Sequence, residues 1–500
     1  MTIWSAKAIR AAGLLALLPS LPLASAPGNF AELPQRAQEF QLANGMRVVV
    51  VERHAAPVVA FHMRAAAGSA DEPEGKSGIC LLAERMFYHG SDAIGSRSPA
   101  QEKAVLQAVE RHMDAVSAEQ GRGEKANPLL SQDSEIQARI AIGSANAMGH
   151  RGVFREALES SGAVNAAINP GGLQTDFHAL LPAHRAEVWP RMIGEWLRKP
   201  SARFFYEERG ALSARLGEQQ RPNARVRAEL IQAAFPASPY ARIQAKAEEA
   251  IRLRPRDLEA FVASRWSPAN LVLAIVGDIT LAEAKRMAET HFGKLAAAPA
   301  QPRVVPKPLE LAADKRITVE MQAAPTLALA WNRPGGKHQD DPAFDVLAAL
   351  LEARKGPVFS QLEELLAAVR VSTALPSDRG PCLFTVEAVL PPTQTFASVE
   401  KQLGELFAQL AAEPLPAAAV DAAKRALRSR VTGALEANTD MASLLARSVS
   451  DRGSVKALED ALDRVAAITP ADIQRLASQY LVKPKFVVHA GLPGMVEETE

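Results

Sequence analysis

The sequence predicts an α/β protein built from two related units, each a β-sheet covered by helices. Two observations carry this prediction. A pattern of two strands and a helix opens both halves of the chain, and a helix followed by a strand closes both halves. The chain has 500 residues, of which 48% are hydrophobic, so it holds enough apolar side chains for two or more hydrophobic cores.

Each half opens with a strand, a turn that ends in proline, a second strand and a helix. In the first half we predict these elements at residues 46–51, 54–57, 58–65 and 78–87. In the second half we predict them at residues 317–321, 322–325, 326–331 and 342–352. This correspondence indicates that the two units descend from one duplicated ancestor.

The two halves also close in the same way. Helices begin at Pro255 and Pro470, each with an aspartate two residues later, and proline with an acidic first turn is a helix start signal. Strands at 271–277 and 486–491 follow these helices. A Pro/Ala-rich linker at 296–308 separates an N-terminal domain, residues 36–295, from a C-terminal domain, residues 309–495.

A segment from residue 98 to about residue 150 has no counterpart in the second half. Residues 98–101 form a capping-box sequence with Pro99 at the first helical position, which predicts a helix to about Glu119. A charged loop at 120–132 and a second helix from Ser134 complete an inserted helical hairpin. The hairpin is either a solvated spacer or an arm that docks a partner.

The N-terminus has the features of a signal peptide, which we place at residues 1–26. Lys7 and Arg10 precede an apolar run at 11–18, and small residues at 24–26 form a cleavage site. The prediction is an exported, periplasmic protein with no membrane anchor after cleavage. The alternative is that this segment is retained as a transmembrane anchor.

Composition excludes several classes of partner. Lys and Arg number 57 against 56 Asp and Glu, so neither nucleic acid nor an anionic membrane is expected as the main partner. The cysteines, Cys80 and Cys382, lie in different halves. We therefore predict two buried free thiols rather than a disulfide.

The most informative segment is GICLLAERMFYHGS at residues 78–91. Its apolar residues repeat at helical spacing, so by itself it would form an ordinary amphipathic helix. It also resembles the zinc-binding helix of the M16 peptidases, the family of insulin-degrading enzyme, pitrilysin and mitochondrial processing peptidase, which reads roughly G-x-x-H-x-x-E-H-M-x-F-x-G-T. The matching residues are Gly78, Glu84, Met86 and Gly90, with Ser91 in place of threonine.

The two histidine positions of that motif are occupied by Leu81 and Arg85. A His-x-x-Glu-His helix binds zinc because positions i and i+4 share one face, with the glutamate between them as general base. Leucine offers no lone pair and arginine stays protonated, so neither can be a zinc ligand. The resemblance therefore implies a scaffold that has lost its catalytic metal.

A later segment, residues 161–182, resembles the strand pair of the family in which an edge strand binds substrate. The residues that match are Gly162, Asn165, Ala166 and Thr175, whereas Ile168 and Phe177 replace a threonine and a tyrosine. The resemblance assigns the substrate strand to Asn165, Ala166, Ala167 and Ile168. Because strand addition uses main-chain groups, this strand could bind an extended peptide without zinc; the alternative is that it is kept only for folding.

Residues 204–219 resemble the helix F-x-x-E-R-x-V-V-x-E-E, whose final acidic pair supplies the third zinc ligand. Glu208 and Arg209 match, but Ala214 and Arg215 occupy the acidic pair. Glu218, one helical turn further on, is an alternative ligand that we do not favour.

In the second half, residues 350–370 resemble the segment of the family that carries a substrate-orienting arginine and, seven residues later, a tyrosine. Glu363 and Arg370 occupy these two positions, so both are altered. The resemblance as a whole covers nearly all of the predicted mature chain, and it implies two M16-type units, each with a mixed, mainly antiparallel sheet.

We hypothesise that the charge of Arg215, with or without Arg85, replaces the metal and pairs with Glu84. No other metal site is predicted, because no two of the histidines we considered have ligand spacing on a predicted helix. They are His54, His62, His89, His112, His150 and His178.

The resemblance thus implies an exported, non-catalytic M16 homologue without a cofactor of its own. In the family, two-unit chains commonly pair with a catalytic sibling, so a hetero-oligomer is expected in which the sibling carries zinc and both chains bind peptide. Two alternatives stay open. The chain is an active metallopeptidase with an unrecognised metal site, or it is a stand-alone peptide-binding scaffold.

Overall fold

The computed structural model describes residues 33–218, 222–236, 238–299, 305, 307–353, 358, 368–373 and 380–494. The predicted signal peptide and Glu363 lie outside these residues, as does part of the predicted linker.

The first half forms a sheet of six strands in the order β1-β2-β6-β3-β5-β4. Only β2 and β6 run parallel in it; the other neighbours are antiparallel. The strands are β1 (Gln38–Gln41), β2 (Arg47–Glu52), β3 (Val58–Ala65), β4 (Val164–Pro170), β5 (Thr175–Pro182) and β6 (Leu271–Gly277).

The second half forms a sheet of five strands in the order β7-β11-β8-β10-β9. The strands are β7 (Lys315–Glu320), β8 (Thr326–Arg333), β9 (Ala368–Thr373), β10 (Cys382–Val389) and β11 (Phe486–Gly491). Here β7 and β11 run parallel and the other neighbours antiparallel. Apart from the additional β1, strand order and direction match the first sheet, which confirms the two related units with mixed, mainly antiparallel sheets.

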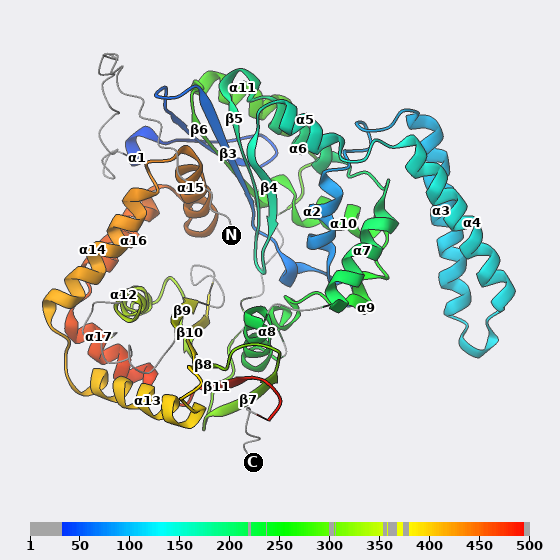
Figure 1. Ribbon diagram of the computed structural model, residues 1–500. Helices are drawn as coiled ribbons and strands as arrows, with labels where there is room; N and C mark the ends of the chain where they lie inside the picture. The colour runs from blue at the N-terminus through cyan, green and yellow to red at the C-terminus, as the bar shows by residue number, and fades with distance from the viewer. Residues whose placement is uncertain are drawn as a thin grey trace, which may run out of the picture.

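Each sheet carries helices of its own half on one face (Figure 1). In the first half these are α2 (Ile79–Phe87), α5 (Val153–Ser160), α6 (Val188–Arg198), α7 (Phe205–Glu218), α10 (Pro255–Arg265) and α11 (Leu281–Phe292), with the short α1 (Leu33–Arg36) and α9 (Ala247–Ala250) at the periphery. In the second half they are α12 (Asp341–Glu352), α13 (Phe396–Ala412), α14 (Ala417–Gly433), α16 (Lys456–Ala466) and α17 (Pro470–Leu476).

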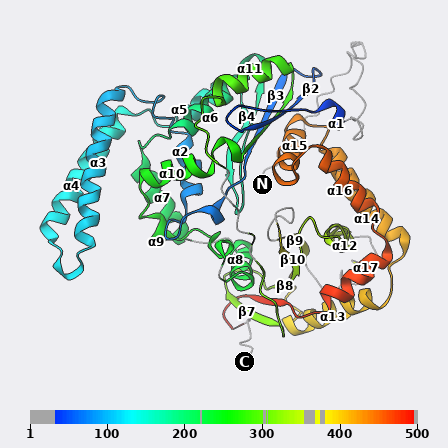
Figure 2. The ribbon, with the colours of Figure 1, turned by 180° about the vertical axis from the view of Figure 1, so that it is seen from behind.

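The other face of each sheet is covered by a helix of the opposite half. Helix α8 (Pro222–Ala234) buries Leu230 against the second sheet, and helix α15 (Asn438–Arg452) buries Leu445 against the first sheet. Figures 1 and 2 show both helices beside the sheet of the other half. Each half therefore completes the core of the other.

A buried ionic contact reinforces this exchange. Arg64 of β3 donates to Asp176 of β5 at 3.1 Å and to Asp451 of α15 at 3.1 Å. His62 Nε2 lies 3.0 Å from the same Asp176 carboxylate. The contact joins the first sheet to a helix of the second half in a region shielded from water, where an ion pair is screened little by salt.

The inserted segment forms a helical hairpin that extends away from the body (Figures 1 and 2). Its helices are α3 (Pro99–Gln120) and α4 (Pro128–Met148). Two expectations about it were wrong. The Ser98 side chain makes no capping hydrogen bond, and the second helix starts six residues earlier than Ser134, because the Asn127 side chain accepts from the N–H groups of Leu129 and Leu130 and caps it.

Other local expectations are confirmed. Helices α10 and α17 begin at Pro255 and Pro470. Cys80 and Cys382 are buried free thiols. Among the helices of the described part of the chain, none has the length and hydropathy needed to cross a membrane.

Candidate functional site

Helix α2, which carries the altered zinc motif, begins on a buried carboxylate. Glu72 accepts hydrogen bonds from the N–H groups of Gly78 at 2.7 Å and Cys80 at 2.8 Å. Gly78 has φ +99° and a Cβ there would lie 3.2 Å from Ala250 Cβ, so the position favours glycine. Burial raises the pKa of Glu72 to about 7.

The three altered or retained motif residues of α2 lie in different surroundings. Leu81 packs partly buried against the core of the first half. Glu84 is half-buried, and its carboxylate forms neither a hydrogen bond nor an ion pair with the described residues. Burial raises the pKa of Glu84, and the charges of Arg215 and Arg85 act in the opposite direction.

Arg85 pairs with Glu208 of α7, not with Glu84. Its Nε donates to Glu208 Oε2 at 2.8 Å, and its Nη2 lies 2.6 Å from the same oxygen. The other oxygen, Oε1, is 3.0 Å from His89 Nε2 and accepts from Arg151 Nη1 at 3.1 Å. The hydrogen bond with His89, with the charge of Arg85, lowers the pKa of Glu208 to about 2.

Our hypothesis about Glu84 therefore needs correction. Ala214 and Arg215 are both exposed on α7, and the described residues form no Glu84–Arg215 ion pair. Burial raises the pKa of Glu84, and the charge of Arg215 offsets only part of this effect. The ion pair that does form, Arg85 to Glu208, joins the two helices that in the family carry the ligands.

Glu208 matches the family motif, but its contacts with His89 and Arg151 were not predicted from the sequence. His89 follows α2 in the sequence and Arg151 follows the inserted hairpin, so no spacing along the chain connected them to Glu208. Arg155 was missed for the same reason; its guanidinium stacks 4.1 Å from the ring centroid of Tyr88.

The residues at the predicted zinc position do not fit a zinc ion. Leu81 has no donor atom, Arg85 is engaged by Glu208, and Arg215 is cationic. Within the part of the chain that the structure describes, no group of three or more His, Cys, Asp or Glu side chains is placed to hold a metal ion.

The predicted substrate strand lies at an edge of the first sheet, as part of β4. A bulge between Val164 and Ala167 leaves Asn165 and Ala166 without partners on β5, and Asn165 has φ +52°, a left-handed conformation that asparagine tolerates. Tyr88, next to α2, donates to the Ala166 carbonyl at 3.4 Å. The structure thus brings β4 beside the altered zinc helix.

In the second half, Arg370 lies exposed on β9, opposite Glu387 of β10. Burial raises the pKa of Glu387, and the charges of Arg370 and Arg227 act in the opposite direction. Glu363, the other predicted residue of this half, cannot be placed beside it because it is outside the described residues.

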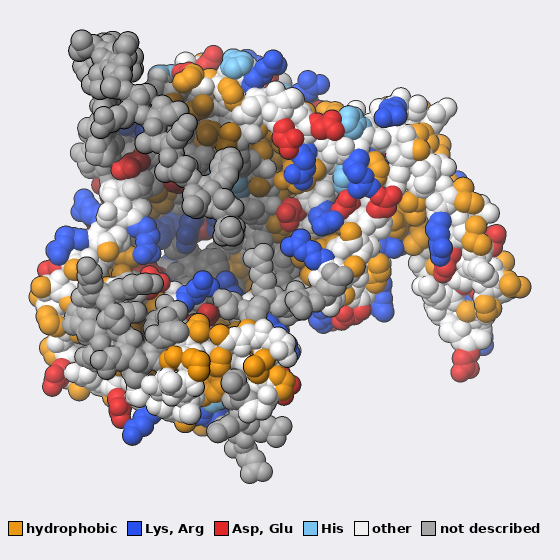
Figure 3. Space-filling view, viewed as in Figure 1, with side chains coloured by type: hydrophobic (Ala, Val, Ile, Leu, Met, Phe, Trp, Pro, Cys, Tyr) orange, Lys and Arg blue, Asp and Glu red, His pale blue; other side chains and the backbone are white. Residues whose placement is uncertain are grey.

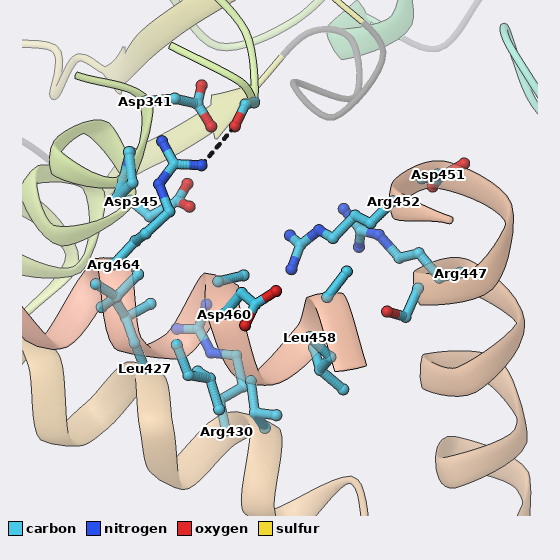
Figure 4. A pocket seen from close by; sticks show the side chains of 18 of the residues that line it. Asp341, Asp345, Leu427, Arg430, Arg447, Asp451, Arg452, Leu458, Asp460 and Arg464 are labelled. Carbon is cyan, nitrogen blue, oxygen red and sulfur yellow. Dashed lines mark hydrogen bonds between the residues drawn. The ribbon is translucent and has the colours of Figure 1, made fainter. Parts of the chain in front are cut away.

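A cavity of about 1120 Å³ lies in the second half, between α12, α14, α15 and α16, and β9 lines part of it through Val371 and Ser372. Figure 3 shows Lys and Arg side chains around a hollow between the two halves. In Figure 4, Arg447 and Arg452 reach from α15 toward Asp460 of α16. The charged lining residues are Lys337, Asp341, Asp345, Glu352, Arg430, Arg447, Asp451, Arg452, Asp460 and Arg464.

Comparisons with known proteins agree with this architecture. Residues 252–427 match the family model described as Peptidase M16 inactive domain. An uncharacterized zinc protease of Mycobacterium leprae is 26% identical over 242 residues, which are 45% of this chain and 52% of that protein. The chain thus spans about half the length of the curated relative it matches.

Two solved structures share the fold over most of the chain. A protease from Helicobacter pylori superposes with a TM-score of 0.73 at 17% identity, covering 91% of this chain and 99% of that one. A peptidase M16 inactive domain from Pseudomonas fluorescens superposes with a TM-score of 0.69 at 18% identity, covering 93% and 100%.

The family match does not depend on the altered zinc motif, because residues 252–427 lie beyond α2 and α7. The matched segment starts just before α10 and ends within α14, so it crosses from the first half into the second. Together with the two units of matching strand order, these comparisons show that the chain is similar to M16 peptidases, in sequence over residues 252–427 and in fold over most of its length.

Proposed function

We propose that this chain is an exported, non-catalytic M16 protein that binds extended peptides as the partner subunit of a catalytic M16 sibling. The observation that carries the proposal is the ion pair between Arg85 and Glu208. It occupies the interface of α2 and α7, where an active relative holds its metal ligands.

Charge balance supports the loss of zinc. In the first half, two carboxylates, Glu84 and Glu208, lie near two guanidiniums, Arg85 and Arg215. A guanidinium satisfies a carboxylate through parallel hydrogen bonds and does so without a metal. A divalent cation added here would meet Arg85 and Arg215 at close range, and their repulsion would oppose its binding.

Two features support peptide binding. Strand β4 is at the edge of the first sheet, with β5 as its neighbour on one side, and strand addition uses the main-chain groups on the free side of such a strand. The cavity of about 1120 Å³ is large enough for a few residues of a peptide. Its lining holds both cationic and acidic side chains, which could pair with a peptide that carries charges of both signs.

Export and a partner rest on the sequence. The first 26 residues have the order of a signal peptide, with basic residues, an apolar run and a small-residue cleavage site. The sibling is expected from the family resemblance, in which an inactive two-unit chain pairs with a chain that carries an intact His-x-x-Glu-His helix.

The test is to isolate the chain with a mild affinity tag from the envelope of its native cell, identify what co-purifies, and assay peptide cleavage with and without a chelator. The proposal expects a stoichiometric M16 sibling that contains zinc, and cleavage that the chelator abolishes. As a matched pair, glutamine replaces the motif glutamate of the sibling in one preparation and Glu84 in the other. Cleavage should be lost in the first and unchanged in the second.

Two outcomes would overturn the proposal. A lone, metal-free and inactive chain would favour a stand-alone peptide-binding protein. A lone chain that contains zinc and loses its activity in the Glu84→Gln variant would show that the chain itself is a metallopeptidase.

A further inference from the structure

The cavity of the second half lies where the duplicated fold places a counterpart of the altered zinc site. In the first half, that site lies beside helix α2, edge strand β4 and helix α7. In the second half, α12, β9 and α14 follow one another in the same order, and β9 is an edge strand as β4 is. All three line the cavity of about 1120 Å³. The second half therefore keeps a candidate ligand site at this position, although it lacks the zinc motif.

Three acidic side chains of the cavity lining are bonded to arginines that lie outside the lining. The Asp451 side chain has no exposed surface and lies 3.1 Å from Arg64 of the first sheet. Asp341 is almost fully buried and lies 2.7 Å from Arg333 of β8, which also pairs with the partly exposed Asp345 at 2.9 Å. These carboxylates are thus held from behind the cavity wall, and their charges are offset there.

The exposed charges of the lining are mainly positive. In the described part of the chain they are four cationic residues, Lys337, Arg430, Arg447 and Arg452, and two acidic residues, Glu352 and Asp460. Of the two acidic residues, Glu352 already lies 3.7 Å from Arg430. Figure 3 shows Lys and Arg side chains around the hollow between the halves. The part of the lining that a ligand can reach therefore has an excess of positive charge.

Two of these cations extend into the cavity from one helix. Arg447 and Arg452 reach from α15 into the space above α16 (Figure 4). A guanidinium has five N–H donors in one plane, so it can bind a ligand in addition to a neighbour that it already contacts. Its paired donors match the two oxygens of a carboxylate.

Apolar side chains line the cavity beside these charges. Leu427 and Val431 of α14 lie one helical turn apart and therefore on one face, and Leu458 and Leu462 of α16 line the cavity as well. Peptide and small-molecule sites commonly combine an apolar surface with a few charged groups that fix the orientation of the ligand.

We infer that this cavity binds a carboxylate of an extended peptide, with Arg447 and Arg452 as its main cationic contacts and the apolar side chains against neighbouring peptide residues. The carboxylate belongs to an acidic side chain or to the C-terminus of the peptide, since both offer the same two oxygens. The inference rests on the peptide binding of the proposed function and adds the class of peptide, which is acidic and not basic.

The test is fluorescence anisotropy of the full chain with labelled, unstructured peptides that share their apolar residues. One peptide has acidic side chains and an amidated C-terminus, a second has amide side chains and a free C-terminus, a third has neither carboxylate, and a fourth has lysines in place of the acidic residues. We expect a peptide with the recognised carboxylate to bind about tenfold or more tightly than the third, and this preference should weaken with salt. Whether the first or the second peptide shows the preference identifies the source of the carboxylate.

Substitutions assign the preference to the cavity. The variant Arg447→Gln/Arg452→Gln should bind the acidic and the neutral peptide equally. The control Arg428→Gln removes an exposed arginine of α14 that does not line the cavity, and it should keep the preference. Circular dichroism and the melting temperature show whether the double variant is folded. If it is not, the single variant Arg452→Gln, at the last residue of α15, should lose part of the preference.

The possible results separate this inference from the proposed function. Peptides that bind equally well whatever their charge, a preference for the lysine peptide, or a preference that survives in the arginine variants would overturn the inference and leave peptide binding intact. Failure of every peptide to bind would overturn the inference together with the peptide binding on which it rests.

Discussion

Helices α2 and α12 hold the same place in the two halves, each following the second strand of its unit, yet they differ in what they carry. Helix α12 buries apolar residues along most of its length, among them Phe344, Leu347 and Leu351. Helix α2 has Glu84 and Arg85 in its middle, and Arg85 is tied to Glu208 of α7. The charged residues of α12 are bonded differently, since Asp341 and Asp345 pair with Arg333 of β8 in the sheet of their own half, whereas Arg85 pairs with a neighbouring helix. Glu84 and Arg85 lie in the segment that resembles the zinc-binding helix of the M16 peptidases.

The largest effect is expected when zinc ligands are introduced on α2 and α7. In a variant with Leu81→His, Arg85→His and Arg215→Glu, the first half would carry the three zinc ligands of the family motif. We expect about one zinc per chain in the variant and almost none in the wild type, because three protein ligands suffice for a catalytic-type zinc site. Metal analysis after dialysis checks this, with Leu81→Ala/Arg85→Ala as the control. A restored variant without zinc would show that α2 and α7 no longer have the ligand geometry.

Helix α8 covers the second sheet and helix α15 covers the first sheet. Weakening either contact should therefore destabilise the sheet of the opposite half. Leu230 and Leu445 are almost fully buried, and replacing either by alanine should cost about 2–5 kcal/mol of unfolding free energy. Hydrogen exchange should show loss of protection in the second sheet for Leu230→Ala and in the first sheet for Leu445→Ala. Loss confined to the half that contains the substitution would contradict the exchange.

The two helices also start differently. Helix α12 begins at Asp341, which Arg333 neutralises at 2.7 Å, whereas α2 begins on Glu72, whose pKa is raised to about 7 by burial. A carboxyl with a raised folded-state pKa adds stability below its unfolded pKa, and this stability is lost as pH rises through the folded pKa. We expect the wild type to lose on the order of 2–3 kcal/mol relative to Glu72→Gln between about pH 5 and pH 8. Parallel urea titrations of both proteins would measure it, and equal pH profiles would contradict the buried, raised carboxyl.

The smallest expected effect is the difference in stability between replacing Arg85 and replacing Arg215. Removing Arg85 leaves Glu208 with fewer partners, so Arg85→Ala should cost about 1–2 kcal/mol. Arg215 is exposed and bonds to neither carboxylate, so Arg215→Ala should change stability by less than about 0.5 kcal/mol. Chemical denaturation of the two variants checks the difference. A larger loss in Arg215→Ala would restore our original hypothesis of a Glu84–Arg215 pair.

The sequence predicted most of the architecture because the architecture rests on local signals. Strand β3 was predicted at its observed bounds, as were β6 and β11, and the proline starts of α10 and α17 were correct. The exchange of α8 and α15 was not predicted, since an apolar helix face does not say which sheet it will cover. The early start of α4 was missed because Asn127, an N-cap without a following acidic residue, lies in a segment that appeared to be a charged loop.

The contacts of the candidate site were not predicted, and the loss of its zinc ligands stays a prediction from the motif. The replacements at Leu81, Arg85 and Arg215 could be read from the motif, because each position has a defined chemical role in the family. The pairing of Arg85 with Glu208 could not be predicted, because Glu208 is distant in the sequence. Whether Arg85 or Arg215 forms an ion pair depends on how α7 crosses α2. The motif likewise could not predict that the half-buried carboxylate of Glu84 lacks a bonding partner among the described residues.

The central claim is that the first half has lost its metal. The most direct measurement is the zinc content of the purified wild-type chain, taken together with its cleavage of unstructured peptides before and after chelation. The account predicts far less than one zinc per chain and no cleavage by the isolated protein. About one tightly bound zinc per chain, with cleavage that stops on chelation, would contradict it.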